Sequence, residues 1–493
     1  MTTDSLTGPD PGADDDEPPA PRGSPAYLRA TIRRPRVGLK PGWPLTALII
    51  GFPLWWLLGL SEFIFIIAAV PMAWHLIRSG GRIRVPSGFG LWALFCGWML
   101  AGAVALQLTA PDTLPPTLDF GTISSFMVRA ANYLAATVIL LYVGNLSEAQ
   151  FPRKKLAKLL GYFALVTIGG GLLGTFAPHL EFTSVTEMLL PKSLASNRSV
   201  EALVHPAVAQ VQDITGEESG RPKAPFDYTN TWGANISILL IWLFTGWWTM
   251  GSRVQRWFAM GGIVIAVVPI VYSLNRGMWV GLGITIVYVA VRMAARGKFL
   301  VLGTLMCGAA LAGMVFVASP LQTIVAERLA NPHSNEIRTT LALTSIKDAA
   351  ASPIIGYGST RKLIGSSQTI AVGRTSSCPQ CGNASIGSTG QLWLLLISNG
   401  FVGTALYVGF FVYAVWRYRG DRTPLGLSGS LSMLLPLWYM FTYVTVGSSL
   451  VIAFLGLGLL WRNERARTEE LDAQRRAVRA RHRPTSLATG RWA

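Results

Sequence analysis

The chain has 493 residues, of which 51% are hydrophobic and only 14% are charged. An ordinary soluble domain carries roughly 25% charged residues, so this composition excludes a soluble enzyme. The formal net charge of +17 would fit a nucleic-acid binder if the basic residues formed a soluble domain. They are instead scattered through short segments between apolar blocks, which argues against nucleic acid as a partner.

The chain divides into a tail, a long apolar region and a second tail. Residues 1–41 combine prolines and an acidic run with a basic end, and we expect a disordered cytoplasmic tail. Between residues 42 and 461 the apolar blocks are about 15 to 22 residues long, enough helix to cross roughly 30 Å of hydrocarbon. Residues 462–493 form a basic tail. The blocks lie at about 43–60, 62–78, 88–108, 124–144, 157–177, 231–250, 257–274, 277–294, 299–318, 391–416, 424–444 and 446–461.

These blocks predict an all-α integral membrane protein with about twelve transmembrane helices. A cytoplasmic N-terminus puts 30 of the 42 Lys and Arg residues on the cytoplasmic side, in agreement with the positive-inside rule. Both termini are therefore predicted to be cytoplasmic. Two long segments, about 178–230 and 319–390, then lie on the outer side. The second, between spans nine and ten, carries helical periodicity and turn signals and is predicted to be structured.

Two arginines lie near the outer ends of predicted spans. Arg276 follows Asn275 at the junction of two apolar blocks, where a cation can meet an anion that arrives along the membrane surface. Arg129 lies about five residues inside the fourth block, and ionisable groups at such depth are functional candidates. Snorkelling of either side chain to the interface is the alternative.

The second outer segment contains two more arginines and a glycine-rich turn. Arg328 and Arg338 are followed by Pro353-Ile-Ile-Gly356-Tyr-Gly358. We expect Arg338 to begin a helix whose apolar face rests on the membrane domain. The glycines allow a sharp turn with exposed backbone amides. Taken singly, these features also fit surface arginines and a loop turn.

The order of the motifs is more specific than any one of them. Phe226-Asp-Tyr-Thr-Asn230 leads into the sixth span, Asn275-Arg276-Gly277 follows the seventh, and a large outer loop after the ninth carries Arg and then Pro-x-x-Gly-x-Gly. The tenth span begins Gln391-Leu-Trp and continues through Asn-Gly400. In this order the motifs resemble the O-antigen ligase and polymerase superfamily.

The resemblance implies a glycosyltransferase that moves a glycan from a polyprenyl diphosphate carrier to an acceptor hydroxyl at the outer membrane face, without a metal or other cofactor. It implies Arg276 and Arg338 as catalytic diphosphate binders. Planar guanidinium groups suit this role, because each holds two oxygens of a departing diphosphate. We expect further substrate contacts from Arg129, Asn230, Asn275, Arg328, Thr389 and Gln391.

The general base is not settled by the sequence. Where the ligases have a histidine before the tenth span, this chain has Thr389, which cannot accept a proton near neutral pH. Another group takes the role, or hydroxyl attack needs little base assistance, or the ligase activity is lost. The candidate bases are Asp227, His333, Glu336 and Asp348.

Cys378 and Cys381 have the spacing of a redox pair and of half a zinc site. Because the segment is predicted to face an oxidising compartment, a local disulfide is the favoured interpretation. The second half of a zinc site is missing, and we expect no metal.

The sequence thus predicts a glycan ligase or polymerase of the bacterial plasma membrane, acting in cell-envelope or exopolysaccharide assembly with inversion at the anomeric carbon. Its partners would be an undecaprenyl or decaprenyl diphosphate saccharide donor, a glycan or lipid acceptor, and membrane lipids. A transporter or flippase of a lipid-linked or anionic substrate is one alternative, and it requires polar residues converging at mid-membrane. A non-catalytic scaffold for envelope assembly is the other, and it predicts that Arg276→Ala leaves function intact.

Overall fold

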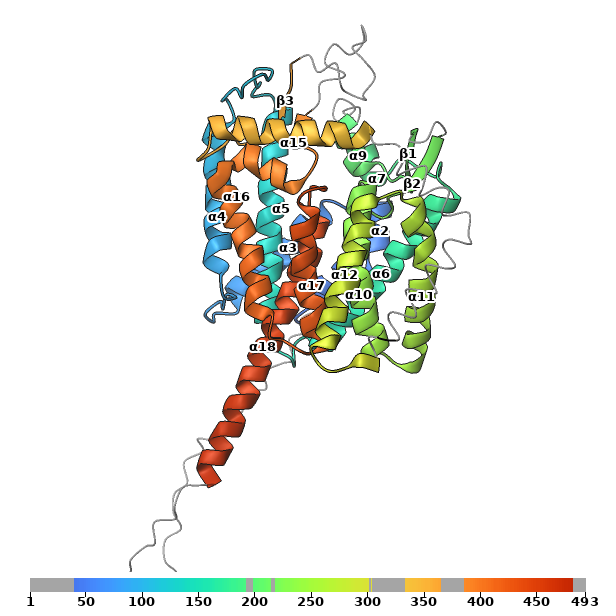
Figure 1. Cartoon of the computed structure of the whole chain (residues 1–493), viewed down its shortest axis with the longest axis vertical. Coiled ribbons are helices and arrows are strands. Elements are labelled where there is room, and N and C mark those ends of the chain that lie inside the picture. Colours follow the sequence, from blue (N-terminus) through green and yellow to red (C-terminus); the bar gives the residue numbers. More distant parts are fainter. Residues whose placement is uncertain are drawn as a thin grey trace, which may run out of the picture. The chain divides into compact units, whose positions relative to one another are not determined.

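A computed structural model describes residues 40–191, 198–213, 218–300, 303, 333–364 and 385–481. Those after residue 40 belong to one compact unit, a bundle of helices with short strands at one end (Figure 1). The first helices are α1 (Trp43–Ile50), α2 (Phe52–Leu57), α3 (Ile64–Arg78), α4 (Phe89–Ala101), the 3₁₀ turn η1 (Gly102–Ala105), α5 (Phe120–Asn145), α6 (Arg153–Phe176), α7 (Val185–Leu189) and α9 (Arg198–Val204). The later ones are α10 (Thr229–Leu243), the π-helix η2 (Phe244–Thr249), α11 (Arg253–Tyr272), α12 (Arg276–Ala294), α15 (His333–Ala351), α16 (Gln391–Tyr418), α17 (Pro424–Tyr439) and α18 (Ser448–Arg481).

Five helices in the described ranges are long and apolar enough to cross a membrane, judged by length and composition: α5, α6, α11, α12 and α16. Two shorter apolar stretches, Ile64–Arg78 and Phe89–Ala105, accompany them. The described chain is therefore a mostly helical membrane protein, the class that the composition predicts.

The described helices differ from the predicted blocks near both ends of the membrane region. The first block is two helices, because Gly51 and Pro53 interrupt it between α1 and α2. The last block does not end at residue 461, since α18 continues through the predicted tail to Arg481. The ninth block, at 299–318, lies almost wholly outside the described residues.

Short strands add to the predicted all-α fold. β1 (Ala209–Asp213) pairs antiparallel with β2 (Glu218–Pro222) inside the first outer segment, and β3 (Arg361–Lys362) pairs antiparallel with β4 (Ser385–Ile386) in the second. Neither pair carries an apolar face of several residues, so hydrophobic periodicity could not predict them.

The two ends of the bundle differ. α15 runs across the ends of the upright helices in Figure 1, and we call this side the α15 end. At the opposite side α18 extends beyond the other helices, and we call that side the tail end (Figure 1). The predicted site residues of the described chain belong to the α15 end.

Aromatic rings fill the bundle where α4, α5, α16 and α18 meet. Trp92 is fully buried, and its ring lies 4.8 Å from Phe454, 5.8 Å from Tyr407 and 6.0 Å from Tyr133, measured between centroids. Its indole nitrogen donates to Thr137 Oγ1 at 2.7 Å, so the polar atom of this large ring is satisfied. This core fixes α5 and α16, which carry Arg129 and Gln391.

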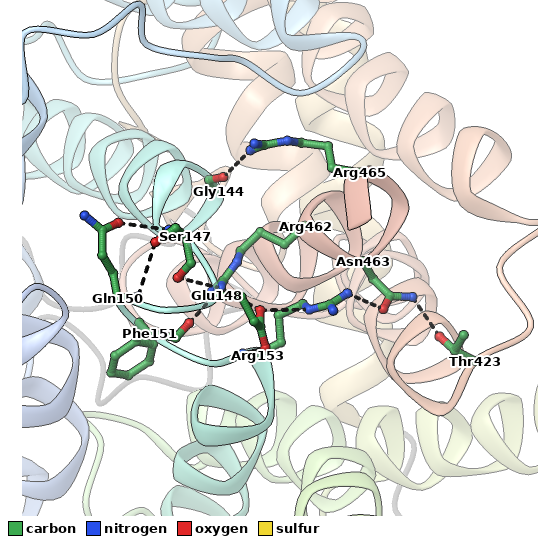
Figure 2. Close-up of polar contacts among 10 residues, drawn as sticks. All are labelled: Gly144, Ser147, Glu148, Gln150, Phe151, Arg153, Thr423, Arg462, Asn463 and Arg465. Atoms are coloured by element: carbon green, nitrogen blue, oxygen red, sulfur yellow. Dashed lines mark hydrogen bonds and ion pairs between the residues drawn. The ribbon is translucent and has the colours of Figure 1, made fainter. Parts of the chain in front are cut away.

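A polar network holds α18 at the tail end (Figure 2). Glu148 Oε2 accepts from Arg153 Nε at 3.0 Å and from the buried Arg462 at 3.1 Å. Arg153 Nη1 also donates to Asn463 Oδ1 at 2.8 Å, and Asn463 Nδ2 donates to Thr423 Oγ1 at 2.9 Å. The network joins the α5–α6 loop to α17 and α18, and Arg153 and Arg462 share the single carboxylate of Glu148.

Candidate functional site

The loop between α17 and α18, residues 440–447, holds the start of α16 at the α15 end. Gly390 caps α16 without a side-chain hydrogen bond, so the first amides of the helix need other acceptors. Gln391 N donates to Tyr443 O and Leu392 N to Met440 O, both at 2.8 Å. A Cβ on Gly390 would lie 2.7 Å from Met440 O, so this close approach requires glycine. The loop, called the α17–α18 loop below, is thus fixed against α16.

Arg338 of α15 also binds the α17–α18 loop. It lies in the second turn of α15, not at the start of that helix as the sequence predicts, because α15 begins at His333. Its Nη1 donates to Thr442 O at 2.9 Å. Burial lowers the pKa of Arg338, and the positive charge of Arg276 lowers it further. The two arginines predicted to bind a diphosphate therefore lie near enough to repel each other.

The start of α12 reaches the loop through Asn275 and Gly277. Asn275 caps α12 and accepts a hydrogen bond from the hydroxyl of Tyr443. A Cβ on Gly277 would lie 2.4 Å from that hydroxyl, so glycine lets α12 approach the loop. Arg276 stands between these two residues. The Asn-Arg-Gly motif therefore positions its arginine against the α17–α18 loop.

A third arginine, Arg221, also lies at the α17–α18 loop, and it was not predicted from the sequence. Arg221 Nε donates to Ser273 O at 2.8 Å, and Arg221 O accepts from Thr229 Oγ1 at 3.2 Å. Arg221 and Arg338 both act electrostatically on the Tyr443 hydroxyl. We call Arg221, Arg276 and Arg338 the arginine cluster. Arg221 lies on β2, in a segment without periodicity, so no local signal marks it.

Asn275 and Gln391, predicted to contact substrate, are held by the scaffold. The buried Gln391 side chain donates to Tyr133 Oη at 2.8 Å and accepts from Thr445 N at 3.1 Å. Asn275 Nδ2 lies 3.4 Å from Thr229 O, one residue before Asn230 in the first turn of α10. These amides orient the loop and the two helices that carry the arginine cluster.

Arg129 and Thr389 flank Gln391. Arg129 Nη1 lies 3.5 Å from Gly358 O, and its charge acts on Tyr133, the partner of Gln391. The helix that carries Arg129 begins at Phe120, four residues before the predicted block. Thr389 Oγ1 is buried without a hydrogen-bond partner among the described residues. The threonine at the predicted base position thus has an unused hydroxyl.

Two carboxyl groups lie at the other end of the α17–α18 loop. A Cβ on Gly447 would lie 3.0 Å from Glu62 Oε2, which places Glu62 beside the last residue of the loop. Burial raises the pKa of Glu62 well above its usual value, and the neighbouring Asp227 raises it further. Burial also raises the pKa of Asp227. Of these two, Asp227 is a candidate base in the sequence, whereas Glu62 is a lone acid at the start of the second apolar block and was not predicted.

The glycine-rich turn docks into a break in α16. Gly400 interrupts the helix at φ 64°, ψ −170°. Tyr357 N and Gly358 N donate to Ile397 O at 2.7 Å and Ser398 O at 2.9 Å, and Phe401 N donates to Pro353 O at 2.7 Å. The prediction of exposed amides in this turn was therefore wrong for Tyr357 and Gly358, because the broken helix leaves carbonyls that need donors. The turn anchors the end of α15.

Arg361, which was not predicted from the sequence, fixes this turn to the end of η1. Its buried guanidinium donates to backbone carbonyls only, among them Leu106 O at 2.9 Å and Tyr357 O at 2.8 Å. Carbonyls at the end of a helical segment need such donors.

Asp348, one of the candidate bases, is not part of the cluster. It lies ten residues after Arg338 on α15, about 15 Å along the helix. Its carboxylate is buried without a hydrogen-bond partner in the described ranges, and burial raises its pKa to about 6. Asp348 faces the glycine-rich turn, since Tyr357 Oη donates to its backbone oxygen at 3.2 Å.

Other predicted positions cannot be placed. Arg328, Cys378 and Cys381 lie outside the described residues, and so do the side chains of His333 and Glu336. Within the described ranges, no three His, Cys, Asp or Glu side chains gather as metal ligands would.

The fold and this cluster together define a helical membrane protein with a cationic polar site at one end of its bundle. No family model matches the chain, and no curated protein matches its sequence.

Proposed function

We propose that the protein is a glycosyltransferase that moves a glycan from a polyprenyl diphosphate carrier to an acceptor hydroxyl, as a ligase or polymerase of cell-envelope or exopolysaccharide assembly. One observation carries the proposal. Three arginines converge on the α17–α18 loop, and burial with like-charge repulsion lowers the pKa of Arg338. Holding guanidinium groups together costs free energy that an anionic ligand would recover, and a diphosphate carries the required charge.

The arrangement suits a displacement at the anomeric carbon. The acceptor oxygen forms a bond to this carbon while the bond to the diphosphate oxygen breaks, and the diphosphate leaves with the electron pair. The arginine cluster stabilises the charge that grows on that oxygen. The acceptor proton passes to the pair of Glu62 and Asp227, whose raised pKa values suit a general base. Inversion of the anomeric carbon follows from a single displacement.

We propose that twelve spans place the α15 end outside the bacterial plasma membrane and the tail end in the cytoplasm. The tail end gathers the basic residues around α18 and the α5–α6 loop (Figure 2). Such a bias towards one side is the mark of cytoplasmic loops. A lipid-linked donor in the outer leaflet would then reach the arginine cluster directly.

The test uses a deletion strain that carries wild type, Arg276→Lys, Arg338→Lys or the control Arg475→Lys at matched expression. Arg475 is exposed on α18, remote from the cluster. Because an ammonium group does not replace a bidentate guanidinium, we expect both cluster variants to accumulate lipid-linked saccharide and to lose polymer by at least about tenfold. The control should match wild type.

Full complementation by Arg276→Ala and Arg338→Ala would overturn the proposal. Loss of polymer with the donor retained on the inner leaflet would favour a flippase instead.

A further inference from the structure

A groove of about 480 Å³ opens at the tail end, far from the arginine cluster. Four elements build it: α1 contributes Ile50, α6 contributes Lys154 to Tyr162, η2 contributes Trp247 and α11 contributes Gln255. Lys154 and Tyr162 are eight residues apart, so the groove follows α6 for about 12 Å. Its volume falls in the range of sites for small ligands.

The walls of the groove are apolar because the polar atoms of its aromatic rings are used elsewhere. Tyr162 Oη donates to Ile50 O at 3.3 Å, and Trp247 Nε1 donates to Lys158 O at 2.8 Å. Both rings therefore present carbon to the groove, together with Leu159. Such walls suit an acyl chain.

The mouth of the groove is cationic. Its lining includes Lys154, Lys155 and Lys158 but no acidic residue. Lys158 Nζ donates to Gln255 Oε1 at 2.8 Å, and Gln255 is itself held by the Ser252 cap of α11, so this ammonium group is positioned. Two of the lysines lie in the first turn of α6, whose helix dipole adds positive potential.

The neighbouring arginines differ in this respect. Arg153 and Arg462 both contact the carboxylate of Glu148, as Figure 2 shows. The lysines of the groove have no such acidic partner among its lining residues. No acidic residue of the groove lining therefore offsets the charge of its mouth.

We infer that this groove binds an anionic phospholipid of the leaflet at the tail end. Its phosphodiester lies against Lys154, Lys155 and Lys158, and one acyl chain lies along Leu159, Tyr162 and Trp247. The combination of charge at the membrane boundary and carbon above it matches such a lipid, and a zwitterionic lipid would lack the net negative charge. The inference does not depend on the proposed glycosyl transfer.

The test measures lipid binding to the purified full chain by native mass spectrometry, with phosphatidylglycerol and phosphatidylcholine as probes. The variant replaces Lys154, Lys155 and Lys158 by Gln. The control replaces three exposed cations of the same end, Lys298, Arg475 and Arg476, by Gln. Each lysine near a lipid phosphate contributes about fivefold to affinity, so we expect phosphatidylglycerol to bind the variant at least about tenfold more weakly than the control.

A second measurement uses the intact groove. A photoreactive benzoylphenylalanine in place of Tyr162 should cross-link to phosphatidylglycerol in vesicles of both lipids. Equal phosphatidylglycerol affinity of the variant and the control would overturn the inference. Cross-linking to phosphatidylcholine in equal yield, or to a second copy of the chain, would do the same.

Discussion

At the scale of single residues, the carboxyl groups of Glu62 and Asp227 predict how the rate of glycan transfer depends on pH. The negative charge of Asp227 raises the pKa of Glu62, so transfer that needs ionised Glu62 should become faster as the pH rises. Asp227→Asn removes one negative charge and lowers the pKa of Glu62. We expect this variant to keep activity and to move the acid limb of its pH–rate profile to lower pH.

The double variant Glu62→Gln/Asp227→Asn should lose about 10²-fold or more in transfer rate, because no base remains. The measurement is glycan transfer in membrane vesicles across pH 4 to 9. An unchanged acid limb in Asp227→Asn, or a double variant as active as wild type, would remove the pair from the mechanism.

Asp348 predicts a pH dependence of stability instead of rate. Its pKa is about 6 in the folded chain against a usual value of 3.8, so folding takes up a proton between these values. Stability should therefore fall as the pH rises from 3.8 through about 6 and then level off. Asp348→Asn keeps the neutral form, and we expect it to raise the unfolding temperature at pH 7 and to flatten this slope.

Thermal unfolding in detergent between pH 4 and 8 measures this effect, and Glu470→Gln on α18 is the matched loss of an exposed carboxylate. A wild-type unfolding temperature that rises over this window would contradict the assigned direction. The sequence makes Asp348 a candidate general base. Its distance from Arg338 along α15 favours a structural role instead.

The site residues that could be predicted from the sequence are those that lie together in a short motif. Asn275, Arg276 and Gly277 are adjacent in sequence, and their placement follows from the end of one helix and the start of the next. Glu62 and Arg221 could not be found in this way, because each meets the α17–α18 loop across more than 200 residues of chain and neither belongs to a periodic pattern.

At the scale of elements, the glycine-rich turn and the break in α16 form one joint. A Cβ on Gly400 would lie 2.6 Å from both Pro353 O and Ile354 O, and its backbone angles are open to glycine alone. Gly400→Ala should therefore destabilise the fold by about 1–3 kcal/mol and loosen α15, which carries Arg338.

Gly409→Ala is the control, since Gly409 lies in the regular part of the same helix and a Cβ there would lie 4.0 Å from Leu91 Cδ1. Alanine favours helix over glycine by about 1 kcal/mol, so the control should be neutral or stabilising. Thermal unfolding gives the first comparison, and hydrogen exchange in α15 gives the second. Equal behaviour of the two variants would show that the joint does not need glycine.

A helix boundary could be predicted from the sequence where the helix and the apolar block begin or end at the same residue. The tenth span is predicted from residue 391, where α16 begins. The last block stops at residue 461 because the sequence turns charged there, but α18 continues, since Glu, Arg and Ala favour helix in water as well as in lipid. Hydropathy marks the membrane boundary and not the helix end.

At the scale of the whole molecule, the proposed glycosyl transfer depends on which end of the bundle lies outside the cell, and the proposed phospholipid binding does not. The sequence could predict a helical membrane protein, because composition and block length decide that class. The number of spans also depends on residues outside the described ranges, so twelve remains a prediction. Orientation rests on the Lys and Arg bias and requires a direct measurement.

Cysteine accessibility supplies that measurement. After replacement of the four native cysteines, Ala350→Cys labels the α15 end and Ala473→Cys labels α18; both alanines are exposed. A thiol reagent that does not cross the plasma membrane should modify position 350 in intact cells and position 473 only after lysis. The reverse pattern would place the arginine cluster in the cytoplasm, out of reach of an outer-leaflet donor, and the glycosyltransferase proposal would then fail together with the orientation. Phospholipid binding in the groove would survive that result, because both leaflets of a bacterial membrane can supply an anionic headgroup.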